Sequence, residues 1–188
     1  MIHDADTSAM QRLAGGEDTA LNEIIHRWQD RLISFLWHMS HDQIVARDLA
    51  QETFVRLYQN RHRYRPHAPF ASYLFQIARN LLFNHVRWSK RHPSESLEFL
   101  SDEGFDPEGN EPSPDKAMVG TETIHQVRLA IADLPDELRE AFILFTYQDL
   151  SYREISATLG CSEKAVETRI YRARQILKEK LSSLVPSA

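Results

Sequence analysis

The segment from Leu150 to Leu181 reads as two short helices joined by a tight turn, and it constrains the fold more than any other part of the chain. Ser151 followed by Glu154 has the form of a capping box, which begins the first helix. Gly160 suits the left-handed end of that helix, and Ser162 is a good N-cap for the next one. The spacing predicts a helix-turn-helix, in which one helix lies in the major groove of DNA and its neighbour braces it.

The second helix of this pair has an apolar stripe on one side and polar residues suited to DNA on the other. The stripe consists of Val166, Ile170, Ala173, Leu177 and Leu181, and the opposite face carries Lys164, Glu167, Thr168, Tyr171, Arg172, Gln175 and Lys178. Arginine and lysine neutralise phosphates or bind guanine, while threonine and tyrosine contact phosphate oxygens or thymine methyl groups. Glu167 is the exception, because phosphates repel a carboxylate unless it accepts a hydrogen bond from a cytosine amino group. The alternative interpretation is an amphipathic helix with a solvated charged face.

Length and composition limit the broad class of protein. A chain of 188 residues with 42% hydrophobic residues is long enough for one domain or two small ones. No apolar run approaches the ~18 residues of a membrane span, and the N-terminus has no secretory pattern. The single cysteine, Cys161, excludes an internal disulfide and fits a reducing cytosol. Its place in the turn predicts a small buried residue.

The net charge of −5 conceals a strong asymmetry along the chain. Residues 1–40 carry −3, residues 41–92 carry +6, residues 93–122 carry −8, and residues 123–188 are neutral. A basic block followed by an acidic block indicates a functional division rather than a uniformly solubilising surface.

Helical periodicity dominates and no stretch has the alternation of a β-strand. We expect helices over residues 10–14, after Asp18, over 43–60, 70–90, 121–133 and 136–147, and in the pair described above. Residues 93–120 combine prolines, glycines and acids with no periodic apolar face, which is typical of a linker. The predicted fold is all-α, with small helical domains at residues 1–92 and 121–188 joined by a flexible acidic linker at 93–120.

The helix over residues 43–60 carries Asp48, Glu52 and Arg56 at steps of four, on the side opposite Phe54 and Leu57. One interpretation is a surface ion pair between Glu52 and Arg56 that contributes about 0.3–0.5 kcal/mol. The other is a docking stripe for a basic partner. Spacing alone favours the first.

The helix over residues 70–90 presents amides, an aromatic ring and arginines along one face. These residues are Tyr73, Gln76, Asn80, Asn84, Arg87 and Arg91, while Phe70, Leu74, Ile77, Leu81 and Trp88 are expected on the apolar side. The preceding loop, residues 61–69, adds Tyr64, Arg65 and His67. Aromatic rings stack on bases, arginines follow phosphates, and amides read exposed base edges, so the pattern suits single-stranded nucleic acid. A solvated helix face is the alternative.

No motif of an enzyme is present in the sequence. Neither a metalloprotease HExxH, a Cys/His cluster, a phosphate-binding loop nor a dinucleotide fingerprint occurs, so we expect no catalytic residue, metal or cofactor. His38 and His41 are expected at the surface rather than as metal ligands.

Four sequence words occur together, and with them the chain closely resembles an extracytoplasmic-function (ECF) sigma factor of bacterial RNA polymerase. They are DLAQETF at 48–54, FASYLFQIARN at 70–80, Leu134-Pro135 with Leu138-Arg139, and the helix-turn-helix from Leu150 to Arg174. Each word is weak alone, but their order and spacing are those of the family over nearly the whole chain.

The resemblance implies that residues 1–92 correspond to sigma region 2 and residues 121–188 to region 4. The segment that docks on the β′ clamp helices would comprise Asp48, Leu49, Gln51, Glu52, Phe54 and Arg56. The part that opens the −10 element and captures a flipped base would comprise Tyr64, Arg65, His67, Phe70, Tyr73, Gln76, Asn80, Asn84, Arg87 and Arg91, with Lys90 beside the backbone. The −35 residues would be Lys164, Glu167, Thr168, Tyr171, Arg172 and Arg174. Leu134, Leu138, Phe142 and Leu144 would build region 4 and its contact with the β flap.

The resemblance also implies partners and a location. They are core RNA polymerase, promoter DNA and an anti-sigma factor, often membrane-bound, which acts on a cytoplasmic chain that does not itself insert into the membrane. The linker would thread the active-centre channel and the RNA exit path. Tyr73 stands where the family commonly has tryptophan, and Glu167 where many members have arginine or lysine, so the −35 preference is open. A free-standing helix-turn-helix regulator is the alternative function, but it leaves the features of residues 48–56 and 64–70 unexplained.

Overall fold

A computed structural model describes residues 2–65, 69–92 and 117–182 of the chain. This part forms eight α-helices and one short 3-10 helix, and contains no β-strand. The elements are α1 (Ile2–Ala14), α2 (Thr19–Ser40), α3 (Gln43–Gln59), η1 (Arg61–Arg63), α4 (Phe70–Arg91), α5 (Ala117–Ala132), α6 (Asp136–Thr146), α7 (Tyr152–Leu159) and α8 (Glu163–Leu181). The predicted all-α class is therefore confirmed.

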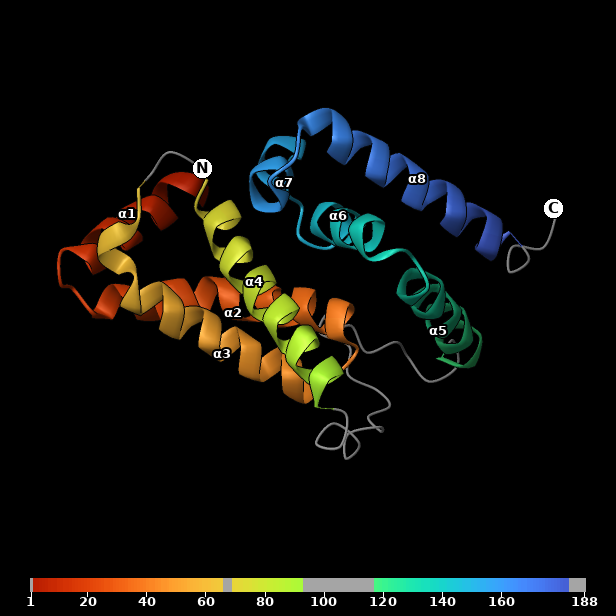
Figure 1. The fold of residues 1–188 in the computed structure, drawn as a ribbon, viewed down its shortest axis with the longest axis horizontal. Helices are drawn as coiled ribbons and strands as arrows, with labels where there is room; N and C mark the ends of the chain where they lie inside the picture. Colours follow the sequence, from red (N-terminus) through yellow and green to blue (C-terminus); the bar gives the residue numbers. More distant parts are fainter. Residues whose placement is uncertain (1, 66–68, 93–116, 183–188) are drawn as a thin grey trace.

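Helices α1 to α4 form a bundle in which α2 packs along α3, and α1 and α4 pack against this pair (Figure 1). Aromatic rings fill its centre. The ring of Phe75 lies 5.2 Å from that of Phe35 and 6.0 Å from that of Trp28, both near edge-on. Edge-on aromatic pairs contribute beyond the apolar area that they bury, so this cluster holds α2 and α4 together.

Helices α5 to α8 form the second unit, and its caps follow the sequence prediction. Ser151 and Glu154 make a complete capping box, and Gly160 adopts the left-handed conformation with φ of 66°. The Ser162 hydroxyl accepts a hydrogen bond of 3.2 Å from the amide of Ala165. Val166, Ile170, Ala173 and Leu177 are buried, as their spacing predicts. Leu181, the last of the stripe, is half-buried.

Several helix ends differ from the prediction. Helix α1 begins at Ile2 rather than at Met10, and α5 begins at Ala117 rather than near Thr121. Asp18 occupies the N-cap position of α2, but its side chain makes no cap hydrogen bond and instead accepts one of 3.1 Å from the Tyr58 hydroxyl. The Asp18 side chain thus binds a residue of another helix instead of the backbone of α2. The spacing of residues along one helix cannot predict such a contact.

Three side chains lie elsewhere than predicted. His38 is buried, not on the surface, with its ring centroid 4.2 Å from that of Tyr147. Trp88 was placed on the apolar side of α4 but is 47% exposed. Cys161 is half-buried. The first two differences have separate causes. The second unit covers the end of α2 at His38, whereas the last buried residue of α4 is Leu82, six residues before Trp88.

The two helical units contact each other, mainly through α4 against α7 and α2 against α6 (Figure 1). The acidic linker falls largely outside the described residues. Within the described ranges, no helix combines the length and apolar character needed to cross a membrane.

Candidate nucleic-acid interface

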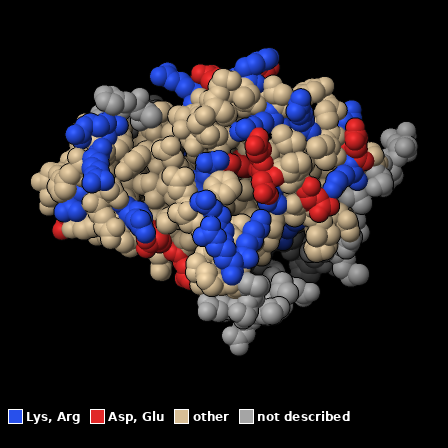
Figure 2. All heavy atoms as spheres, viewed as in Figure 1, with Lys and Arg blue, Asp and Glu red and all other residues tan. Residues whose placement is uncertain are grey.

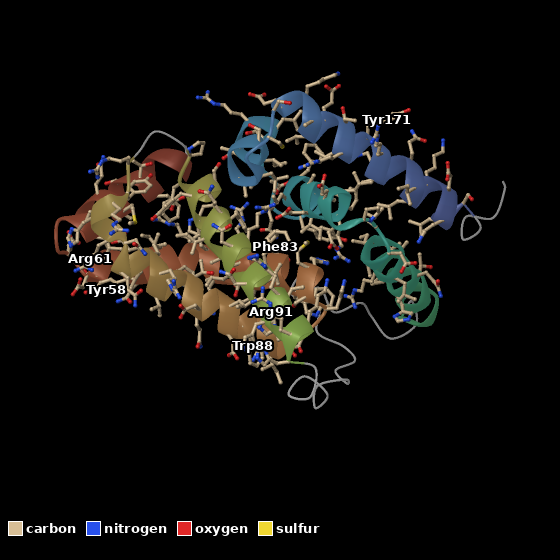
Figure 3. The ribbon with its side chains drawn as sticks, viewed as in Figure 1. Tyr58, Arg61, Phe83, Trp88, Arg91 and Tyr171 are labelled. Atoms are coloured by element: carbon tan, nitrogen blue, oxygen red, sulfur yellow. The ribbon has the colours of Figure 1, made fainter. Side chains whose placement is uncertain are left out.

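The outer face of α8 carries the residues predicted to read DNA. Lys164, Glu167, Tyr171, Arg172 and Arg174 are exposed. Tyr171 is 62% exposed, although its ring is large and apolar, and it projects from the free side of α8 (Figure 3). An exposed tyrosine on a basic helix is suited to thymine methyl groups and phosphates.

Glu167 does not present a free carboxylate on this face. Its Oε2 accepts a hydrogen bond of 2.8 Å from Lys164 Nζ, one helical turn earlier. Thr168, a half-buried residue, donates its hydroxyl to the Lys164 carbonyl at 2.8 Å. The acidic exception in the sequence is therefore paired with a cation of the same face, which reduces its repulsion of phosphates.

A shallow hollow of about 320 Å³ lies between the start of α7 and the face of α8. Tyr152 lines it together with Thr168, Tyr171 and Arg174. The Arg174 guanidinium also lies 5.1 Å from the centroid of the Phe145 ring, so this cation is oriented by α6.

The predicted polar stripe on α4 is open to solvent. Gln76, Asn80, Asn84, Arg87 and Arg91 are all exposed. No acidic residue occurs between Glu52 and Glu95 in the sequence. Figure 2 shows lysine and arginine side chains gathered over the lower half of α4. The stripe therefore has the charge that a nucleic-acid strand requires.

Beside the start of α4, aromatic rings form a compact cluster. The ring of Tyr64 lies 5.3 Å from that of Tyr73 and 6.2 Å from that of Phe70. Tyr64 is 7% exposed and Phe70 is fully buried, so only Tyr73, which is half-buried, reaches the surface. Burial, and next the neighbouring Tyr64, raises the pKa of the Tyr73 hydroxyl, which keeps it a neutral donor.

The Tyr64 hydroxyl is buried and has no hydrogen-bond partner among the described residues. A buried polar group without a partner costs about 1–3 kcal/mol. Arg65 is exposed, and His67 lies outside the described residues. The cluster thus combines a partly open ring with an unsatisfied hydroxyl.

The residues predicted to dock on a basic partner lie along α3, beside a groove of about 910 Å³ between α2 and α3. Gln51 and Phe54 line this groove with Ile33 and Val55. Asp48 is exposed and Leu49 is half-buried.

Farther along α3, Glu52 accepts a hydrogen bond of 2.6 Å from Arg56 Nε. The surface ion pair that spacing favoured is present. A surface ion pair alone, however, does not account for the apolar groove between α2 and α3.

The contact between the two units was not predicted. The Ser72 hydroxyl of α4 donates a buried hydrogen bond of 3.0 Å to the Glu154 carbonyl of α7. Arg31 of α2 donates to the carbonyl of Gln148. Arg79 of α4 pairs with Glu140 of α6 at 2.6 Å, and Glu140 is buried. Burial raises the pKa of Glu140 more than the neighbouring Arg79 lowers it. No signal in the sequence joins these distant residues.

Within the described residues, no three histidine, cysteine or acidic side chains are grouped so that they could hold a metal ion. The arrangement offers charge, aromatic rings and grooves, which suit the binding of nucleic acid and protein.

Two family models match the chain. The model for sigma-70 region 2 matches residues 24–92, and the model for sigma-70 region 4 matches residues 124–177. The first match covers α2 to α4 and the second covers the helix-turn-helix.

Similar proteins extend over both units. The RNA polymerase sigma-H factor of Pseudomonas aeruginosa is 29% identical over the full length of both chains. The ECF RNA polymerase sigma factor SigE of Mycolicibacterium smegmatis is 32% identical over 90% of this chain and 65% of its own. The fold is similar to that of the sigma factor RpoE of Bartonella quintana, solved with the anti-sigma factor NepR, with a TM-score of 0.69, 23% identity and coverage of 86% of this chain and 96% of that one.

Proposed function

The chain belongs to the ECF sigma factors of the sigma-70 family, and we propose that it binds core RNA polymerase through α3, opens the −10 element with α4 and reads the −35 element with α8. In this scheme region 2 spans residues 1–92, region 4 spans residues 121–188, and residues 93–120 connect them. The single observation that carries the proposal is the presence of both an open, acid-free polar stripe on α4 and an exposed recognition face on α8 in one chain.

Polymerase binding is assigned to the α2–α3 side. Asp48 offers an exposed carboxylate there, and the groove lined by Gln51 and Phe54 offers apolar area. Interfaces gain affinity from a buried apolar centre and specificity from charges at the rim, and this surface has both. Leu49, which is half-buried, and the ion pair of Glu52 with Arg56 lie on the same helix and are assigned to the same surface.

Promoter opening is assigned to α4 and the aromatic cluster before it. Tyr73 would stack on a base that has left the duplex, and the buried Tyr64 hydroxyl, which has no partner among the described residues, would hydrogen-bond to its edge once the entering base exposes it. Flipping a base costs a few kcal/mol, which such contacts offset. Phe70 is buried beneath Tyr64 and acts by positioning it. The exposed residues Gln76, Asn80, Asn84, Arg87 and Arg91 would then follow the strand, with Arg65, His67 and Lys90 beside it.

The −35 element is assigned to α8, through Lys164, Glu167, Thr168, Tyr171, Arg172 and Arg174. The two elements lie about two turns of DNA apart, or about 70 Å. Because α7 is packed directly on α4, the units must separate before both reach their elements. The linker provides the required length.

We propose that an anti-sigma factor holds the chain in its packed form, as the partner of a protein with this fold is named an anti-sigma factor. In this proposal the polymerase supplies the chemistry of transcription. The site of action is the cytoplasm, where core polymerase is present.

A run-off transcription experiment tests the proposal. Purified chain and core polymerase are incubated with a library of promoter fragments, and the products are sequenced. Transcripts should start downstream of a shared pair of elements only when both proteins are present. A free-standing regulator would instead change transcription only when another sigma factor is added.

A further inference from the structure

Trp88 is a large aromatic side chain to which the proposed function assigns no role. It lies in the last turns of α4 and is 47% exposed, although the sequence pattern placed it on the apolar side. Figure 3 shows it with Arg91 at the lower, free end of α4. Much of the large apolar surface of the Trp88 ring is therefore accessible to a ligand.

His92 fixes the Trp88 ring in place. The two rings stack with centroids 4.8 Å apart and planes inclined by 24°. His92 Nδ1 lies 3.0 Å from the Trp88 carbonyl oxygen, which only accepts, so Nδ1 donates this bond. The stacked pair is therefore held in one geometry before any ligand arrives, which lowers the entropy lost on binding.

Positive charge surrounds the pair. Arg87, Lys90 and Arg91 are exposed, and α4 contains no acidic residue. Asn84 and Arg91 lie at i−4 and i+3 from Trp88 and are thus its neighbours on the helix surface. An aromatic ring among arginines, with an amide beside it, matches the chemistry of a single-stranded nucleic-acid site.

We propose that the stacked pair of Trp88 and His92 is a second base-stacking platform on α4, which receives a nucleotide of the separated promoter strand. This inference deepens the proposed function and depends on it. The helical rise of about 1.5 Å per residue places Trp88 about 22 Å from Tyr73 along α4. A strand that follows the stripe and keeps the spacing of about 3.4 Å per nucleotide that it has in a duplex would reach Trp88 about six or seven nucleotides from the base at Tyr73.

Photocrosslinking in the complete holoenzyme tests the platform. The non-template strand of a promoter found by run-off transcription is substituted with 5-iodouracil at one position at a time, and crosslinked residues are identified by mass spectrometry. We expect a crosslink to Trp88 at about six or seven nucleotides from the position that crosslinks to Tyr73. The Trp88→Phe variant should keep a crosslink at this position, whereas Trp88→Ala should lose it.

Affinity for the opened promoter provides a second readout. Trp88→Ala should weaken binding about tenfold, and Trp88→Phe should weaken it much less. His92→Ala should have an intermediate effect, because it removes the ring that supports Trp88 and leaves the stacking ring in place. Leu129→Ala is the matched control, since Leu129 is also a 47% exposed apolar side chain and lies on α5. Thermal unfolding of each variant separates a loss of fold from a loss of contact.

The possible outcomes distinguish failure of the stacking platform from failure of the proposed function. If the wild-type chain directs no run-off transcription, the proposed function fails and this inference fails with it. If wild type transcribes while Trp88→Ala binds opened promoter equally well and no crosslink reaches Trp88, only the platform is rejected. Weaker binding of core polymerase by Trp88→Ala, without any DNA crosslink, would assign Trp88 to a protein contact and would also reject the platform.

Discussion

Arg79 Nε of α4 lies 2.6 Å from Glu140 Oε1 of α6, and this ion pair joins the two helical units. The carboxylate is 4% exposed and the guanidinium 27%. Removing one partner from a buried pair leaves an unpaired charge, which typically costs about 3–5 kcal/mol. The pair is therefore a direct means of testing whether the packed form can be opened.

We predict that Arg79→Glu separates the units without unfolding either one, because two carboxylates then face each other at the contact. The radius of gyration measured by small-angle X-ray scattering should increase. The double variant Arg79→Glu with Glu140→Arg should restore the smaller radius of gyration of wild type, as a double-mutant cycle requires for two residues in direct contact. The control is Arg12→Glu, since Arg12 pairs with Glu17 and Glu23, which both belong to the first unit. Equal radii for all variants would contradict the prediction.

The stability of the fold should also depend on pH. Burial raises the pKa of Glu140 above its ordinary value, so the folded chain prefers the protonated carboxyl. Its contribution is fully present below the ordinary pKa of a glutamate, and it is lost as the pH rises through the raised pKa. The free energy of unfolding of wild type should therefore decrease over this interval relative to that of Glu140→Gln, which does not titrate. Urea unfolding at a series of pH values measures it, and parallel profiles of the two proteins would exclude Glu140 as the cause.

The Tyr64→Phe variant distinguishes a structural role of the Tyr64 hydroxyl from a role in binding the flipped base. The Tyr64 hydroxyl has no partner among the described residues, so its removal should leave the free energy of unfolding unchanged or increase it, because a buried group without a partner costs about 1–3 kcal/mol. Promoter opening should slow by roughly threefold to tenfold if the hydroxyl binds the flipped base. Stopped-flow fluorescence of a labelled promoter gives the rate. A stabilised variant that opens promoters at the wild-type rate would remove the hydroxyl from the mechanism.

Glu167→Lys should change the preference at one position of the −35 element. The substitution removes the partner of Lys164 and adds a second cation at the groove, which favours guanine over cytosine. Selection from a randomised −35 library measures the preference. Glu167→Gln is the control, because it frees Lys164 without adding charge and should give a smaller change. An unchanged preference in Glu167→Lys would show that α8 meets DNA in another orientation.

Asp48→Arg combined with Glu52→Arg should weaken binding of core polymerase by at least tenfold, because the two carboxylates are replaced by cations that repel a basic partner. Fluorescence anisotropy with labelled chain measures this affinity. Glu17→Arg with Glu23→Arg makes the same change in charge elsewhere on the first unit and should have little effect. If both double variants bind equally well, the docking surface does not lie on α3.

The sequence predicts those features that depend on neighbours along the chain. The capping box at Ser151, the left-handed Gly160 and the buried stripe of α8 follow from local spacing, and the structure has all of them. Helices α3 and α4 also end within a residue of the predicted bounds.

The failures arise where distant elements meet. His38 is buried because Tyr147, which follows α6, covers it, and Asp18 caps nothing because Tyr58 of α3 binds it. The partners of these two side chains lie far away in the sequence, where spacing along a helix carries no information. Trp88 is exposed because the last buried residue of α4 is Leu82, so periodicity assigned Trp88 to a core that ends before it.

Permanganate footprinting of a promoter is the most direct test of whether this chain, together with core polymerase, opens the −10 element. Permanganate oxidises thymines only when they are unpaired. With core polymerase and this chain together, thymines of the −10 element should become reactive, and with either protein alone they should remain protected. Protection of the −35 region by the chain together with core polymerase, without reactive thymines at −10, would contradict the account, since the chain would then bind promoters without opening them.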